Sequence, residues 1–574
     1  MSERTVSEIL GADFVSPWFG ITFVKFYRPV ATFILGIEFL MFGVHPLPYT
    51  VLHLLVHGLN ACLVYLLVRR LLATDRWQEP FLAALLFALY PLHCNSILHI
   101  ASFSNLYGAT FILSSLVFFA ASRLNHGRKA YLGSILCFAL ALGCYEQAVI
   151  LPALLLGCDL ILPLAPERRT IKARLKVFWP YVVMLAAYFG VRFLVLGEFI
   201  GGYAGIDTSL EQWKRALANL MYSFYKMINP SWEGGEFMPH LGMVGVAVTV
   251  AMGICLWLRV SGREVYFSVL MLFALVWIAI CQAPFQFCGV VPANGRYWYL
   301  AEVGLAFGIM GVSVMVATLL RVRTSMVSVP ITVALLLFWL PLLAANIDRH
   351  RRAGEITRSI QKSVVEAAQG ESPQCRVFLS GYPMFIRTPM GAQVAQVFHW
   401  GLRDAMGPPF LSHNFAVFSL PQSDRMGLLP VAKGVRDGQI LTWTKQWGTV
   451  PFDVTPEDEI SLAQLREIQI LAPKEGAQLW VDGSPNQATV EAPGYPNLTL
   501  ITAGPCKSSK KAVKIHQTKG TPVKIAFPTG LIEVQRQLYG DEVIWWVEAR
   551  DNKGKLRAVS PLRRIVKGTF RNSL

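Results

Sequence analysis

The stretch TVLHLLVHGLNACLVYLLVR (50–69) decides the class of this protein, because its 20 residues include no acidic side chain and one basic side chain, at the end. About 20 mostly apolar residues form a helix long enough to cross the hydrocarbon core of a bilayer. His53, His57 and Asn60 recur along it at helical spacing. The stretch therefore predicts a membrane-spanning helix with polar side chains on one face.

Comparable apolar runs recur through the first 346 residues. They are continuous, which favours helices over the alternating strands of a membrane barrel. The region 130–164 allows more than one division. The ten predicted spans are 50–69, 80–98, 104–122, 130–146, 147–164, 178–197, 240–258, 265–283, 298–320 and 326–346.

The composition agrees with a membrane domain followed by a soluble one. The 574 residues are 54% hydrophobic and 15% charged, whereas soluble domains carry about 25% charged residues. A single soluble enzyme and a disordered chain are therefore excluded. The net charge of +16 does not indicate a nucleic-acid partner, because the membrane part is sparsely charged and residues 347–574 have an ordinary soluble composition.

Lysine and arginine mark every second connection between spans, and such connections face the cytoplasm. This pattern places residues 347–574 outside the cytoplasm. The protein is predicted to be multi-pass in a bacterial inner membrane, or in the endoplasmic-reticulum membrane if the host is eukaryotic. The marking residues are Arg69, Arg70, Arg76, Arg123, Arg128, Lys129, Arg168, Arg169, Lys172, Arg174, Lys176, Arg259, Arg263, Arg321 and Arg323.

The same pattern places the N-terminus outside. The apolar run 30–44 is 15 residues long and contains Glu38, which suits an interfacial helix better than a span. Since nothing before it would carry the N-terminus across, we expect a first helix to be missing from this sequence.

The fold class that we expect is an all-α polytopic membrane domain followed by an extracytoplasmic mixed or β-rich domain. Short strand-like segments divided by Gly, Pro, Asp and Asn turns indicate a sandwich near the C-terminus. Cys375 and Cys506 lie outside the membrane part, and their spacing leaves a disulfide open. The expected parts are 1–49 (external loop with interfacial helix), 50–346 (membrane helices), 347–460 (helix plus small α/β unit) and 461–574 (β-sandwich-like domain).

Ionisable side chains in or beside spans are functional candidates, because burying them in lipid is costly. His53 and His57 are four residues apart and would need a third ligand, such as His93 or His99, to hold a metal ion. The alternative, which we favour, is hydrogen bonding between helices.

Glu146, Arg296 and Arg28 are further candidates at the predicted outer face. Glu146 lies in an outward turn, GCYEQ, that water reaches. Arg296 is the only basic residue of its loop and lies between aromatic residues. Such an arginine either binds a lipid phosphate through two hydrogen bonds or anchors the chain at the interface. Arg28, before Pro29, allows the same two interpretations.

Two N-terminal segments carry the first part of a family resemblance. They are FYRPVATFILGIEFLMFGVHPLPY (26–49) and FALYPLHCNSILHIASFSNLYG (87–108). They resemble the Tyr-Arg-Pro stretch and the His-Pro-x-His segment of GT-C-type membrane glycosyltransferases. The similarity is closest to transmembrane O-mannosyltransferases with tetratricopeptide repeats and to their bacterial relatives. His57 stands at the position of a family histidine, and His93 matches the second segment.

Two later segments complete the resemblance. GCYEQAVILPALLLGCDL (143–160) is similar to the family's Lys-Glu segment, with Glu146 matching. GRYWYLAEVGLA (295–306) is similar to its Arg-Tyr-Leu-Tyr-Leu-Pro segment, with Arg296, Tyr297 and Tyr299 matching. Each motif alone is weak, but their order and spacing make the set fairly specific.

The resemblance implies that a sugar passes from a polyprenyl-phosphate carrier to an extracytoplasmic hydroxyl of a protein or glycan. An acidic residue would take the hydroxyl proton, and basic residues would hold the leaving phosphate. The base that the resemblance implies is an acidic residue of the first external loop, where Asp13 lies; Glu146 is the other catalytic candidate. The implied phosphate-binding residues are Arg28, Arg296 and Tyr297. No cofactor is required, and the divalent metal considered above is the less favoured alternative.

The sequence departs from the family at several charged positions. Asn95 stands for a Glu, Asn105 for an Asp, Phe103 for an Arg and Tyr145 for the Lys. The catalytic Asp that follows the family's first span is absent, and the sandwich-like domain replaces the repeats. The polar cluster that we expect at the outer face comprises His53, His57, His93, Asn95 and Asn105.

Three functions stay open at this point. The first is a glycosyltransferase with lipid-bilayer, lipid-linked sugar and acceptor partners. The second is a catalytically degenerate protein of the same fold that binds a glycan or lipid, or scaffolds a partner. The uncharged residues Asn95, Phe103, Asn105 and Tyr145, at positions where the family has charged ones, favour this second function. The third is a transporter or flippase, which we disfavour because the sequence lacks two similar halves with Gly/Pro-broken helices.

Overall fold

A computed structural model gives the fold in two compact units. The first unit holds residues 3–350 and 387–394, and the second holds 351–386 and 395–574. Asp13, Cys375, Cys506 and the predicted span 240–258 lie outside the described residues. The structure describes residues 26–72, 76–125, 127–165, 167, 170–199, 209–230, 263–287, 295–368, 376–387, 393–398, 405–407, 410–411 and the strands given below.

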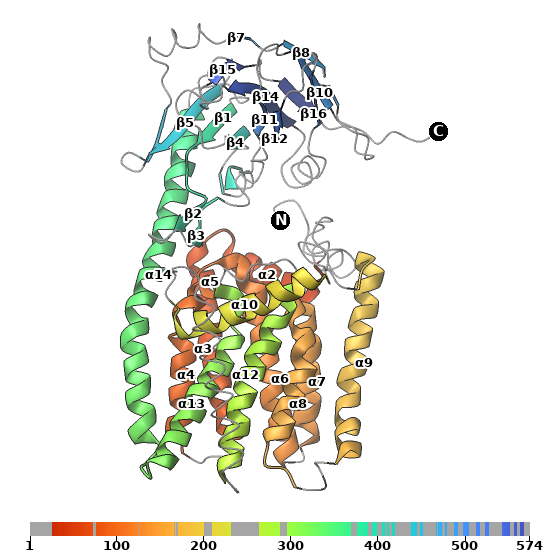
Figure 1. Ribbon diagram of the computed structural model, residues 1–574, viewed down its shortest axis with the longest axis vertical. Helices are drawn as coiled ribbons and strands as arrows, with labels where there is room; N and C mark the ends of the chain where they lie inside the picture. Colours follow the sequence, from red (N-terminus) through yellow and green to blue (C-terminus); the bar gives the residue numbers. More distant parts are fainter. Residues whose placement is uncertain are drawn as a thin grey trace. The chain divides into compact units, whose positions relative to one another are not determined.

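The described part of the first unit is helical (Figure 1). Short 3₁₀ helices stand where the longer helices break. They are η2 (Pro91–His93), η3 (Ile100–Ser102), η4 (Glu146–Ile150) and η6 (Gly295–Trp298). The α-helices are α2 (Pro29–Phe42), α3 (Pro46–Leu71), α4 (Gln78–Ala88), α5 (Cys94–Ile97), α6 (Phe103–Asn125), α7 (Arg128–Cys144), α8 (Leu151–Ile161), α9 (Ile171–Leu196), α10 (Leu210–Ile228), α12 (Arg263–Phe287), α13 (Ala301–Leu319) and α14 (Ser325–Ala368).

The described residues include five helices that are long and apolar enough to cross a membrane: α3, α6 with its lead-in from Ile100, α9, α13 and α14. A sixth span results if α4 and the segment Pro91–Ile97, bent by 46°, are counted together. Leu175, Trp179 and Leu194 of α9 are exposed, and exposed apolar surface of this kind faces lipid. The chain is therefore an integral membrane protein.

The prediction of ten spans is not confirmed. In place of one helix over 147–164, the structure has η4 followed by α8, which is 11 residues long. The break arises because Tyr145 adopts an extended backbone conformation between α7 and η4. The predicted spans 50–69, 104–122, 178–197, 298–320 and 326–346 correspond to the five helices named above, and 265–283 falls on α12, which has 25 residues.

Connections between successive helices fall at two ends of the bundle. We call one the basic end; it carries the turns after α3, α6, α8 and α13, where most of the basic residues cluster. The other, the site end, carries the four 3₁₀ helices, and Figure 1 shows α2, α5 and α10 there. The positive-inside pattern predicts that the basic end is cytoplasmic.

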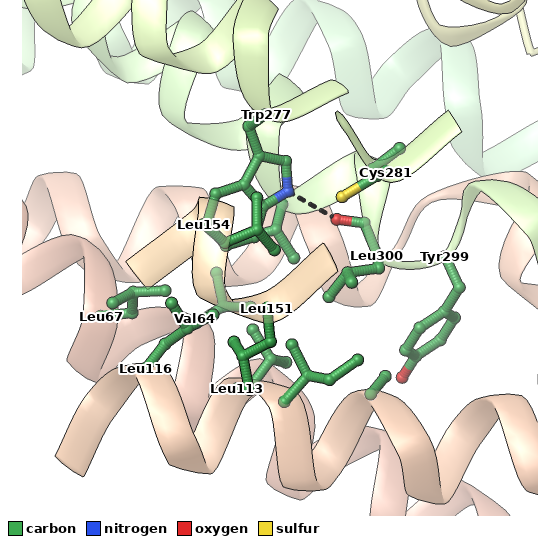
Figure 2. Packing of buried hydrophobic residues seen from close by; sticks show 14 of the residues in the cluster. Val64, Leu67, Leu113, Leu116, Leu151, Leu154, Trp277, Cys281, Tyr299 and Leu300 are labelled. Carbon is green, nitrogen blue, oxygen red and sulfur yellow. Dashed lines mark hydrogen bonds between the residues drawn. The ribbon is translucent and has the colours of Figure 1, made fainter. Parts of the chain in front are cut away.

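Apolar side chains from α3, α4, α6, α7, α8, α12 and α13 form one core. Residues three apart on a helix share a face, so each helix contributes pairs at this spacing. Trp277 of α12 is fully buried, and its indole N–H donates to the carbonyl of Leu300 at 2.9 Å. Figure 2 shows this packing with Val64, Leu67, Leu113, Leu116, Leu151 and Leu154.

α9 joins the bundle through a row of polar contacts seven residues apart. Tyr181 donates its hydroxyl to Ser134 Oγ at 2.7 Å, and Ser134 and Ser115 donate to each other's carbonyls at 2.8 Å. At the basic end, Arg174 Nε donates to Asp159 Oδ2 at 2.9 Å. Hydrogen bonds of this kind hold helices together where lipid weakens the hydrophobic drive for association.

The second unit begins with the end of α14. Ile360 and Val364, one helical turn apart, pack against Val377, Leu379 and Leu441 of a sheet. In that sheet of order β4-β1-β5-β6, β1 is parallel to β4 and β5, whereas β6 is antiparallel to β5. Its strands are β1 (Arg376–Ser380), β4 (Ala416–Ser419), β5 (Gly438–Thr444) and β6 (Gly448–Pro451).

The remaining described strands form three sheets. One is the pair β2 (Phe385–Arg387) and β3 (Gln393–Gln396). Another is the antiparallel sheet of β13 (Val523–Ala526), β10 (Gln487–Glu491) and β8 (Gln469–Ala472). The third is mixed and contains β12 (Val513–His516), β11 (Asn497–Ala503), β14 (Glu542–Arg550), β15 (Leu556–Val559), β7 (Arg466–Glu467), β16 (Arg563–Val566) and β9 (Ala477–Gln478).

We predict that Asp159→Asn lowers the stability of the bundle. Asp159 is buried and pairs with Arg123 at 2.5 Å and with Arg174 at 2.9 Å. Removing one partner of a buried ion pair leaves an uncompensated charge and costs about 3–5 kcal/mol. Thermal unfolding in detergent would show a lower midpoint. The control is Glu211→Gln, which removes an exposed pair with Lys214 and is expected to change nothing; equal midpoints for both variants would contradict the prediction.

Candidate functional site

Arg28, Ser104 and Glu146 come together at the site end from three parts of the chain. Arg28 Nε donates to Glu146 Oε2 at 2.8 Å, and its Nη2 lies 2.6 Å from the same oxygen. Its Nη1 donates to Ser104 Oγ at 3.3 Å. Arg28 is 8% exposed, and the Glu146 side chain is 22% exposed. Two residues singled out from the sequence thus form an ion pair that water still reaches.

Aromatic rings fix the Arg28 guanidinium from two directions. Its Cζ lies 4.2 Å from the ring centroid of Phe26 and 4.9 Å from that of Tyr145. Cation–π attraction of this kind adds to the ion pair. Tyr145 stands where the resembled family has a Lys. It carries no positive charge of its own, and its ring instead stabilises the charge of Arg28.

Two glycines allow α2 and Tyr145 to approach this site. A Cβ added to Gly143 would meet Val30 Cγ2 at 2.5 Å, and one added to Gly108 would meet Tyr145 Cβ at 2.8 Å. Both distances are shorter than real Cβ contacts, so a side chain at either position would displace its neighbour. The glycines therefore set how closely the start of α2 lies against the end of α7.

Arg296 and Tyr297 of η6 belong to the same site. Arg296 Nη2 donates to the Tyr297 hydroxyl at 2.9 Å, and its Cζ lies 4.9 Å from the Tyr297 ring. The phenol of Tyr145 interacts electrostatically with Tyr297, with both arginines and with Glu146. The charges of both predicted phosphate-binding arginines therefore act on the Tyr145 phenol.

His99 adds no positive charge beside Arg296. Burial lowers its pKa to about 3, and the nearby charges of Arg296 and His350 contribute to the shift. Its Nδ1 hydrogen-bonds with Ser102 Oγ at 3.0 Å. The imidazole is therefore neutral at physiological pH, whereas Arg296 carries a positive charge.

His57, His93 and Tyr299 form a separate buried cluster. His57 Nε2 lies 3.0 Å from the carbonyl of Ala88, which can only accept, so the proton is on Nε2. The Tyr299 hydroxyl then donates to His57 Nδ1 at 2.7 Å and accepts from Asn60 Nδ2 at 3.0 Å. The His93 ring lies 5.2 Å from that of His57. These contacts join α3 to η2 and to the residue after η6.

The other members of the predicted polar cluster lie in different contacts. His53 Nε2 is 3.7 Å from Glu38 Oε1, which accepts from the Tyr107 hydroxyl. Asn105 Oδ1 accepts from Ser96 Oγ at 3.2 Å. The Asn95 side-chain amide lies against His350, with Oδ1 at 3.0 Å from His350 Nε2. The predicted outer-face cluster is therefore several pairs of contacts, and His53 and His57 do not converge on a common point.

Among the residues that the structure describes, no three His, Cys, Asp or Glu side chains lie close enough to hold a metal ion. Ser104 is a site residue that the sequence analysis missed. Its signal was a small polar residue at the start of an apolar run, directly after Phe103.

Comparisons with known proteins give low similarity. No family model and no curated protein matches the chain. The apo structure of ArnT from Cupriavidus metallidurans is similar at 13% identity and a TM-score of 0.33, covering 81% of this chain and 89% of that one. The structure of the same protein bound to undecaprenyl phosphate is similar at 14% identity and a TM-score of 0.30, covering 82% and 91%. Both TM-scores are below 0.5.

Chemically, the site combines a carboxylate with cations and phenols. Arginine hydrogen-bonds phosphate strongly, and a tyrosine hydroxyl that accepts from arginine still has its own proton to donate. A carboxylate that water reaches can accept a proton from a hydroxyl. The arrangement therefore suits binding of a phosphate next to an activated hydroxyl.

We predict that Tyr299→Phe destabilises the site end. It removes the hydroxyl to which His57 and Asn60 are bonded, and unpaired buried polar groups cost about 1–3 kcal/mol. The thermal unfolding midpoint should fall. Tyr65→Phe, on the same helix α3, is the matched control, because the Tyr65 hydroxyl makes no hydrogen bond within the described residues. An unchanged midpoint for Tyr299→Phe would refute the assigned hydrogen bonds.

Proposed function

We propose that this protein is a GT-C-type membrane glycosyltransferase that moves a sugar from a polyprenyl-phosphate donor to an extracytoplasmic acceptor hydroxyl. The observation that supports this best is the Arg28–Glu146 ion pair next to Arg296 and Tyr297. These residues lie in three of the four segments that resemble the family. The acceptor is a protein or a glycan, and the site end is the extracytoplasmic end.

Glu146 is the base in this proposal. Its Oε2 is held by Arg28, and its Oε1 is buried and makes no hydrogen bond within the described residues, which leaves Oε1 to accept a proton. Oε1 takes the proton as the acceptor oxygen forms its bond to the sugar C1. The bond between C1 and the phosphate oxygen breaks, and the phosphate leaves with the electron pair. General bases of this kind contribute about 10²- to 10⁴-fold to rate.

The two arginines have different roles. All three side-chain nitrogens of Arg28 contact Glu146 or Ser104, so Arg28 orients the base. Arg296 is half-buried and bonds to the Tyr297 hydroxyl, so both can donate to one phosphate. Donors preorganised around a developing charge stabilise the transition state. Arg296 and Tyr297 therefore hold the leaving phosphate.

We predict that Glu146→Gln and Arg296→Gln act on different steps. Glu146→Gln should lower sugar transfer about 10²- to 10⁴-fold and leave lipid binding nearly unchanged. Arg296→Gln should weaken binding of undecaprenyl phosphate about 10- to 100-fold, because a hydrogen bond to a charged group contributes about 1.5–3 kcal/mol. The measurements are lipid binding in nanodiscs and transfer of label from polyprenyl-phosphate sugars to a membrane extract.

Arg215→Gln is the matched control, because Arg215 is exposed on α10; it should alter neither quantity. Wild-type protein that binds undecaprenyl phosphate but transfers no sugar from any donor would favour the degenerate binding protein. The neutral positions Asn95, Asn105 and Tyr145 motivate that second candidate. Wild-type protein that does neither would overturn the proposed donor.

A further inference from the structure

Two buried glutamines connect the helix breaks that carry the site. Gln147, directly after Glu146, donates its amide Nε2 to the carbonyl of Cys281 at 2.8 Å. Gln282, directly after Cys281, donates its Nε2 to the carbonyl of Tyr297 at 3.0 Å. Gln147 is 3% exposed and Gln282 is 0% exposed. The amides thus link η4 to α12 and α12 to η6.

The helix α12 is suited to this position because of Pro284. Proline has no N–H, so the carbonyl four residues before it loses its helical donor, and the proline ring disturbs the carbonyls nearby. In a membrane, such carbonyls need a partner inside the protein. The carbonyl left without its helical donor is that of Ile280, and Gln147 donates to the next one, that of Cys281, in the same turn. The hydrogen bond therefore joins the start of η4 to the turn that Pro284 disturbs.

A third contact on α12 holds the segment that follows Arg296. Trp277, one turn before Cys281, donates its indole N–H to the carbonyl of Leu300 at 2.9 Å (Figure 2). Together with Gln282, it binds two carbonyls, of Tyr297 and Leu300, to α12. A Cβ added to Gly295 would meet the carbonyl oxygen of Leu92 at 2.3 Å, so η6 also lies tightly against η2.

We propose that Gln147 and Gln282 are positioning residues, and that their two hydrogen bonds set the spacing between Glu146 and the Arg296–Tyr297 pair. This deepens the proposed function, on which its catalytic meaning rests. Gln147 directly follows Glu146, the group that it positions. Gln282 directly follows Cys281, whose carbonyl accepts the hydrogen bond from Gln147. A shift of about 1 Å at a reacting centre costs about 10²-fold, so a site divided between η4 and η6 requires such a link.

The test uses Gln147→Met and Gln282→Met in the full-length protein, because methionine keeps the length of the side chain and removes the donor. Hydrogen–deuterium exchange in nanodiscs should rise in residues 145–150 for the first variant and in 295–300 for the second. Gln282→Met should also weaken undecaprenyl phosphate binding about 10-fold or more. In an Arg296→Gln, Tyr297→Phe background it should add no further loss, because both groups that it positions are already removed.

Tyr131→Phe is the matched control. The Tyr131 hydroxyl donates to the carbonyl of Val177 between α7 and α9, the same kind of bond at a distance from the site. It should leave exchange at the site end and lipid binding unchanged. A general loss of stability would weaken binding by the same factor in the wild-type and the Arg296→Gln, Tyr297→Phe backgrounds, and that outcome would overturn the positioning role.

The readouts separate the two proposals. If wild-type protein binds no undecaprenyl phosphate, the proposed donor is wrong. Hydrogen–deuterium exchange then still tests whether the glutamine hydrogen bonds position η4 and η6. If exchange in 145–150 and 295–300 is the same in both variants as in wild type, the links do not position η4 and η6, whatever the lipid result.

Discussion

Every polar group that this bundle buries must find its partner inside the protein, because the hydrocarbon of a bilayer offers none. At the basic end, Asp159 meets that requirement for two arginines from α6 and α9. At the site end, Arg28 holds the carboxylate of Glu146, and Arg296 donates to the Tyr297 hydroxyl. The same requirement produces a buried ion-pair network that joins helices at the basic end, and a pairing of carboxylate and arginine in the candidate site at the site end.

The apolar helices could be predicted from the sequence, because lipid-facing runs such as 50–69 and 178–197 are continuous. The turn at GCYEQ was also predicted, but not the close packing of Gly108 against Tyr145 and of Gly143 against Val30. Span 147–164 was predicted as one helix, whereas the structure has η4 and a short α8.

The candidate site was predictable in part. The family-like segments supplied Arg28, Glu146, Arg296 and Tyr297 one at a time, but no spacing in the sequence pairs residues 118 apart. His53 and His57 share a helix face, yet they meet different partners, Glu38 and Tyr299. Helical periodicity identifies a face, whereas the neighbour on that face comes from tertiary packing. For this reason the predicted cluster divides into separate contacts.

The positions of the 3₁₀ helices explain why the chemistry gathers at one end. Irregular backbone at membrane depth is tolerated only where protein buries it or where it lines a water-filled cavity. η4 and η6 carry Glu146 and Arg296, and buried side-chain amides and an indole satisfy the carbonyls around them. Broken helices leave backbone groups to be satisfied by side chains, and those side chains then hold the breaks in place. The hydrogen bonds from Gln147, Gln282 and Trp277 thus offset the free-energy cost of interrupting the helices, and the same bonds fix the geometry of the site.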